Sequence, residues 1–61
     1  MPIVHVKILE GRNDDQKKAL IENVTAAVVE SIDCPKERVS VHVEEMAKTN
    51  FGVAGVRMSD Q

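Results

Sequence analysis

The stretch PIVHVKIL, residues 2–9, alternates between two kinds of side chain. Every second position carries an apolar β-branched residue, namely Val4, Val6 and Ile8. The positions between them are mixed, namely Ile3, His5 and Lys7. A period of two with many β-branched residues is typical of a strand with one apolar face. We therefore predict a strand here, with its Val4 and Val6 face toward the core.

The next residues, EGRNDDQKK, end this alternation and predict the start of a helix. Gly11 permits a turn, and Asn13 followed three residues later by Gln16 matches a capping box. Apolar residues then recur with a helical period until the loop that contains Pro35: Leu20, Val24, Ala27, Val28 and Ile32. The predicted helix runs over residues 14–32.

Alternation returns in RVSVHVEEM, residues 38–46. One face of this second predicted strand carries the valines Val39, Val41 and Val43. The other face carries polar side chains: Arg38, Ser40, His42 and Glu44. A strand, a helix and a strand make a βαβ unit with parallel strands and a right-handed crossover. The remainder, with Gly52 and Gly55 around a short apolar run, suits a small hairpin or packing arm. We predict one α/β (α+β) domain over residues 1–61.

The chain is too small to build a large core alone. At this length, folding hides only about 60% of the unfolded surface. Cys34 is the only cysteine, so an internal disulfide is excluded, and no Cys/His cluster has zinc spacing. One helix covers one face of a two-stranded sheet, which leaves the face with Ile3 and His5 in need of another chain. Self-association is therefore predicted.

Charge and hydropathy exclude several classes of partner. The formal net charge is -2, with 8 basic and 10 acidic residues scattered along the chain, which argues against a nucleic-acid interface. No apolar run approaches the roughly 20 residues of a membrane span, and the features of a signal peptide are missing. We expect a soluble cytoplasmic protein with no nucleic-acid or membrane partner.

Four stretches resemble the 4-oxalocrotonate tautomerase family across essentially the whole chain: MPIV, LEGR before DDQKKALI, EEMAK, and NFGVAGVR. Their order and spacing make the match specific. The resemblance implies a homohexamer, a trimer of dimers, without cofactor or metal. It also implies an isomerase that moves a proton between oxygen and carbon in enol and keto acids such as 2-hydroxymuconate. Pro2 would be the catalytic base, as a free amine after removal of Met1.

The chemistry of Pro2 supports this role. An α-amino group has a reference pKa of about 7.7 to 8.0, so a modest decrease caused by nearby cations or burial leaves it neutral and basic. The proline ring fixes φ and helps to aim the nitrogen lone pair. The simpler alternative is that Pro2 only begins a strand, where a missing N–H costs little.

Arg12 and Phe51 are the next candidates. A guanidinium can bind a carboxylate through two parallel hydrogen bonds, and the resemblance implies that Arg12 binds the substrate carboxylate. The alternative is a solvated arginine near Asp14 and Asp15. Phe51 is the only aromatic residue, and the resemblance implies that it walls the proline pocket, while ordinary core or interface packing is equally compatible.

Ser40 departs from the family pattern. The best-known members have a second arginine there, which binds the substrate's carboxylate and enol oxygen, whereas a serine hydroxyl brings no charge. Strand alternation places Arg38 on the same face, roughly 6.6 Å away, where it is a possible substitute. The alternative is an exposed charge at the start of a strand.

Other readings of the sequence stay open. His5 and His42 make an incomplete metal site and are interpreted as part of the polar face. A non-catalytic binding or assembly module is the alternative to an enzyme, favoured if Met1 remains attached. Hydration or dehalogenation of small unsaturated acids is another, with Glu44 or Glu45 activating water.

Overall fold

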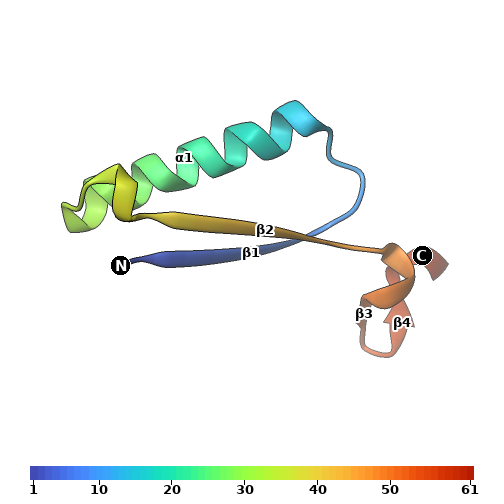
Figure 1. Cartoon of the computed structure of the whole chain (residues 1–61). Helices are drawn as coiled ribbons and strands as arrows, with labels where there is room; N and C mark the ends of the chain where they lie inside the picture. The colour runs from blue at the N-terminus through green and yellow to red at the C-terminus, as the bar shows by residue number, and fades with distance from the viewer.

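The computed structural model describes residues 1–61 and contains four strands, one α-helix and three 3-10 turns. In chain order they are β1 (Ile3–Leu9), α1 (Asp14–Ile32), η1 (Lys36–Arg38), β2 (Ser40–Met46), η2 (Lys48–Asn50), β3 (Gly52–Val53), β4 (Val56–Arg57) and η3 (Met58–Asp60). α1 lies along one face of the β1–β2 sheet, and the β3–β4 hairpin projects beyond its far end (Figure 1). The predicted βαβ unit with a C-terminal hairpin is confirmed.

β1 and β2 are parallel and paired along their whole length. Ile3 lies opposite Ser40 at one end, and Leu9 lies opposite Met46 at the other. The side chains of the valine face are half-buried: Val4, Val6, Ile8, Val41 and Val43. On the opposite face Ile3 is 73% exposed. The predicted division between a covered and an uncovered face is therefore confirmed.

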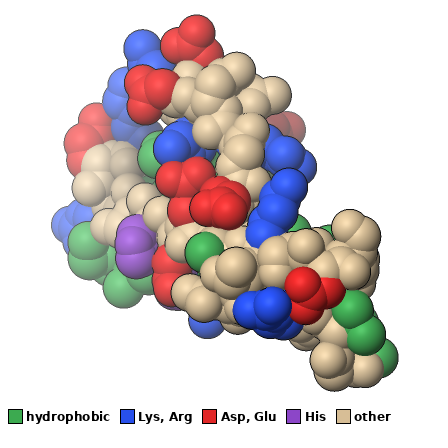
Figure 2. All heavy atoms as spheres, turned by 90° about the vertical axis from the view of Figure 1, so that its right-hand side faces the viewer, with side chains coloured by type: hydrophobic (Ala, Val, Ile, Leu, Met, Phe, Trp, Pro, Cys, Tyr) green, Lys and Arg blue, Asp and Glu red, His purple; other side chains and the backbone are tan.

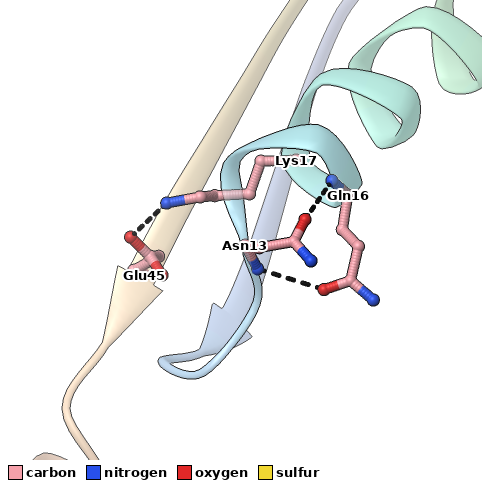
Figure 3. A network of polar contacts seen from close by, with 4 residues as sticks. All are labelled: Asn13, Gln16, Lys17 and Glu45. Carbon is pink, nitrogen blue, oxygen red and sulfur yellow. Dashed lines mark hydrogen bonds and ion pairs between the residues drawn. The ribbon is translucent and has the colours of Figure 1, made fainter.

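α1 begins with the predicted capping box. The Asn13 side chain accepts a hydrogen bond of 2.8 Å from the Gln16 N–H, and Gln16 Oε1 accepts one of 3.0 Å from the Asn13 N–H (Figure 3). These two bonds satisfy N–H groups that have no partner inside the helix. One turn later, Lys17 Nζ donates a 3.0 Å hydrogen bond to Glu45 Oε1 and ties the helix to β2 (Figure 3).

Loss of the cap should destabilise the protein. Replacing Asn13 by Ala should lower the free energy of unfolding by about 1 kcal/mol, because the Gln16 N–H loses its acceptor. Urea unfolding at one fixed chain concentration measures this difference. Asn23→Ala, at an exposed position inside α1, is the matched control and should not destabilise. Equal losses in the two variants would contradict the capping role.

Part of the apolar face of α1 is not covered by the rest of the chain. Leu20, Val24 and Val28 are half-buried, whereas Ala27 and Ile32 are exposed, Ile32 by 60%. Two strand axes lie only about 4.8 Å apart, so the sheet is narrower than a helix of about 10 Å diameter. The sequence predicted a wider buried stripe than a single chain covers. No helix of the structure combines the length and apolar character needed to cross a membrane.

The segment before β2 corrects one prediction. Arg38 belongs to the 3-10 turn η1 and not to the strand. Pro35, with φ -68, precedes this turn, and the Arg38 N–H donates to the Pro35 carbonyl at 3.0 Å. Because β2 begins only at Ser40, strand alternation does not place Arg38 on the face of Ser40, and that argument is wrong.

The isolated chain is open and extended. No residue is buried, and the radius of gyration is 14.5 Å, compared with about 10.5 Å for a compact domain of this length. Acidic and basic side chains intermingle at the end that faces the viewer in Figure 2, and hydrophobic side chains lie exposed on the projecting hairpin. These include Val53 and Val56, 56% and 46% exposed. A single copy therefore leaves much apolar surface without a partner.

Candidate functional site

Pro2 and Ser40 lie side by side at the beginning of the sheet. The Ser40 N–H donates a 3.0 Å hydrogen bond to the Pro2 carbonyl. This bond fixes the backbone of Pro2, which is half-buried, whereas Met1 beyond it is 82% exposed. The η1 turn ends at Arg38, two residues before Ser40, and lies at the same end of the sheet (Figure 1). A free amine on Pro2 would thus sit at a fixed point next to the Ser40 backbone.

Arg12 and Phe51 belong to the opposite end of the sheet. Arg12 lies in the loop that follows β1, and Phe51 follows η2 after the end of β2. Glu10 joins the two segments: its N–H donates to the Met46 carbonyl at 2.9 Å, and its carboxylate accepts a 3.4 Å hydrogen bond from the Lys48 N–H. The Arg12 loop and the segment leading to Phe51 are therefore held together.

A pocket of about 300 Å³ opens beside the Arg12 loop. Five residues line it, from β1, the loop and the first turns of α1: Ile8, Arg12, Gln16, Lys17 and Leu20. Lys17 is paired with Glu45 at 3.0 Å, whereas no hydrogen bond or ion pair within the chain engages the Arg12 side chain. Its guanidinium is free to bind a carboxylate in a bidentate fashion.

One chain does not bring the predicted site residues together. The 7 residues of β1 separate Pro2 from the Arg12 loop, and a strand of that length spans about 23 Å. A small acid bound by Arg12 therefore cannot reach the nitrogen of Pro2 in the same chain. This separation follows from the length of the predicted strand, so the sequence already contained the signal.

A polar cluster on the uncovered face was predicted only in part. The rings of His5 and His42 are stacked, with centroids 4.8 Å apart, as expected for residues opposite each other in the register. His5 Nε2 also lies 2.8 Å from Glu44 Oε1. Glu44 follows His42 by two positions in β2, and this spacing is the sequence signal for the contact.

The same family emerges from comparison with known proteins. The family model described as Tautomerase enzyme matches residues 2–61. A probable tautomerase of Halalkalibacterium halodurans is 59% identical over 61 residues, which is 100% of both chains. The 2-hydroxymuconate tautomerase of Bacillus subtilis is 52% identical over 60 residues, 98% of this chain and 97% of that one.

A solved structure agrees with these relatives. The heterohexamer 4-oxalocrotonate tautomerase of Chloroflexus aurantiacus superposes with a TM-score of 0.94 at 30% identity, over 98% of this chain and 97% of that one. Fold and sequence together define an isomerase built on the small βαβ chain. The chain belongs to the tautomerase family, among the 4-oxalocrotonate tautomerases.

Proposed function

We propose that the chain catalyses proton transfer between the enol and keto forms of small 2-hydroxydienoic or 2-oxo acids such as 2-hydroxymuconate. The base is the amine of Pro2 after Met1 has been removed. The observation that carries the proposal is the position of Pro2, half-buried at the start of β1 with its carbonyl held by the Ser40 N–H at 3.0 Å. The name of the Bacillus subtilis relative supports the substrate.

The proposed site is shared between copies of the chain. Because Pro2 and Arg12 lie at opposite ends of β1, Pro2 of one copy meets Arg12 and Phe51 of another. The absence of any buried residue in one copy favours such sharing, and a similar protein is a heterohexamer. We propose a homohexamer, arranged as a trimer of dimers.

The proton transfer conserves all atoms. The neutral amine of Pro2 takes the proton of the enol hydroxyl, and the O–H electron pair becomes the new C=O bond. The double bond shifts, and a substrate carbon takes the proton back from the proline ammonium. Arg12 binds a substrate carboxylate, and the apolar ring of Phe51 excludes water and favours the neutral amine.

The alternative of hydration or dehalogenation receives less support. That chemistry needs a group beside the proline that activates water. Glu45 is paired at 3.0 Å with Lys17, which lines the pocket beside Arg12. Glu44 binds His5 on the uncovered face. Both candidate carboxylates already have a side-chain partner, which favours tautomerisation.

The direct test is ketonisation of 2-hydroxymuconate, followed by the loss of dienol absorbance. Two samples are compared, one without Met1 and one that keeps it, each verified by intact mass. Turnover confined to the sample without Met1 supports the proposal. Equal turnover in both samples would contradict it, because an amide nitrogen cannot act as the base.

Ser40 should widen the range of substrates. A diacid has two carboxylates, and a site with Arg12 as its only arginine clamp makes a charge-assisted contact with one of them. Such a contact contributes roughly 1.5 to 3 kcal/mol, or about 10- to 150-fold. We expect monoacid enols such as phenylenolpyruvate or 2-hydroxypenta-2,4-dienoate to be used nearly as well as 2-hydroxymuconate. Ser40→Arg should raise the diacid preference in kcat/KM by that factor.

Arg38 provides the control for this prediction. Its backbone lies in η1, two residues before Ser40 in the chain, so its long side chain is a competitor for the role of second clamp. If Ser40→Arg leaves the diacid preference unchanged and Arg38→Ala abolishes it, Arg38 holds the second carboxylate. If Arg38→Ala changes nothing, the second clamp is missing as proposed.

A further inference from the structure

The Gln16 side chain has one bound end and one free end. Its Oε1 accepts a 3.0 Å hydrogen bond from the Asn13 N–H, and its own backbone N–H donates a 2.8 Å bond to Asn13 Oδ1. Because the Asn13 N–H can only donate, the amide oxygen is the bound atom, and Nε2 lies on the side turned away from Asn13 (Figure 3). No hydrogen bond within the chain uses Nε2. Its two N–H donors are therefore available at a fixed position.

Gln16 lines the same pocket as Arg12. The pocket holds about 300 Å³ and is lined by five residues, none of which carries a carboxylate: Ile8, Arg12, Gln16, Lys17 and Leu20. The charge of Lys17 is balanced by Glu45 at 3.0 Å, whereas the guanidinium of Arg12 has no partner within the chain. The free side-chain groups of the pocket are therefore donors, which suits an anion. The two apolar residues add surface for a short hydrocarbon chain.

The capping box alone does not require a glutamine at position 16. Glutamate and glutamine both complete such a box, and a negative charge in the first turn of a helix is favourable. A glutamate here would, however, line the pocket with Arg12 and give its guanidinium a partner within the chain. The neutral amide caps α1 and leaves the guanidinium free for a carboxylate from solution.

We propose that Gln16 is a specificity-determining residue for the substrate: its Nε2 donates to the carboxylate that Arg12 binds, and its neutrality keeps Arg12 unpaired. The inference rests on the part of the proposed function that assigns Arg12 to the substrate carboxylate. Both groups can bind one carboxylate, because its two oxygens offer about four lone-pair sites and a bidentate guanidinium uses two of them. The arrangement selects an anionic group at this position over an uncharged ester or amide.

Gln16→Glu tests this role in the full, processed chain. The new carboxylate can still accept the Asn13 N–H, so the helix keeps its cap and the free energy of unfolding should not fall. The KM for 2-hydroxymuconate should rise about 10- to 150-fold, because Arg12 gains a partner within the chain and the amide donor is lost. The value of kcat should change less than about threefold, as expected when binding common to substrate and transition state is removed. An unchanged KM overturns the proposal.

Three further variants separate the effect on binding from effects on stability and overall charge. Asn23→Asp adds the same charge at an exposed position inside α1 and should leave KM unchanged; a rise equal to that in Gln16→Glu overturns the local effect. Asn13→Ala keeps the backbone N–H that holds Gln16 Oε1, so it should lower the free energy of unfolding without raising KM. Gln16→Met removes the amide donors without adding charge and should raise KM by about 10-fold. A KM equal to that of the unmodified chain in Gln16→Met overturns the donor role.

Binding of adipate, a saturated dicarboxylate that cannot tautomerise, separates this inference from the proposed function. Titration calorimetry should show weaker binding in both Arg12→Ala and Gln16→Glu. Weaker binding in Arg12→Ala alone overturns the inference and leaves the proposed function intact, whereas unchanged binding in Arg12→Ala overturns the role of Arg12 and with it the inference. If the unmodified chain binds adipate too weakly to measure, the KM comparison decides. A chain that neither binds adipate nor turns over 2-hydroxymuconate overturns both proposals.

Discussion

A chain that keeps Met1 should convert 2-hydroxymuconate at no more than about one-thousandth of the rate of the processed chain. The reason is chemical, because removal of Met1 turns the Pro2 nitrogen from an amide into a secondary amine. A positioned general base contributes about 10²- to 10⁴-fold to such a reaction, and an amide nitrogen contributes nothing as a base. The loss should appear in kcat, with the assembly unchanged.

The variant Pro2→Ala separates the basicity of the terminal amine from the orientation of its lone pair. A processed alanine still offers a primary amine, but without the ring that fixes the direction of the lone pair. Turnover should fall by about 10- to 100-fold, which is less than in the chain that keeps Met1. The measurement is the rate of dienol loss in samples matched by intact mass and by sedimentation. A chain that retains Met1 and keeps full activity would exclude the proline mechanism.

The local elements of the fold were predictable from the sequence because their signals are local. Asn13 and Gln16 mark the helix start through bonds between residues three apart, and the predicted range 14–32 agrees with α1. Alternation identified both faces of β1 and β2, because a side-chain period of two leaves no choice once one face is covered. The parallel pairing followed from the helical crossover.

The wrong predictions arose where a side-chain period was extended to residues that the strand or the sheet does not reach. Alternation in β2 was continued backward to Arg38, but Pro35 precedes a 3-10 turn that ends the extended backbone. Ala27 and Ile32 fit the helical period and yet remain exposed, because the two-stranded sheet is too narrow to cover them. In the proposed hexamer, other copies would supply the contacts that cover them, and no pattern within one chain specifies the geometry of those contacts.

The candidate site shows the same division. The types of its residues were identifiable from the sequence, since an amine that can lose its charge and an unpaired guanidinium each suit one part of an enol acid. Their spatial relation was not identified, although β1 alone separates Pro2 from Arg12 by its 7 residues. The prediction treated Pro2 and Arg12 as parts of one site, although the two groups lie at opposite ends of the sheet in one chain.

Two impaired variants should therefore gain activity when they assemble together. The first variant keeps Met1 and has an intact Arg12, and the second is a processed chain with Arg12→Ala. The first lacks the base, and the second should lose about 10- to 150-fold in kcat/KM because the substrate carboxylate has lost its charged partner. In a mixed oligomer, a free Pro2 of the second variant can face an intact Arg12 of the first.

The expected recovery follows from random mixing. In an equimolar oligomer, half of the Pro2 positions and half of the Arg12 positions are intact. If each site takes these residues from different copies, about one quarter of the sites are complete, so activity should reach about one quarter of that of the unmodified protein. If both residues came from one chain, no chain would carry an intact pair and nothing would be recovered. Native mass spectrometry of co-refolded chains establishes that mixing has occurred.

The comparison is decisive because assembly and activity are measured on the same sample. The control combines the two variants without co-refolding, so that each remains in its own oligomer and no activity is gained. Mixed oligomers that remain as inactive as their parents would contradict the shared site, whatever the fold of one chain suggests. Recovery near one quarter would show that the strand separating Pro2 from Arg12 is the reason the enzyme needs more than one copy, since each copy supplies one half of two different sites.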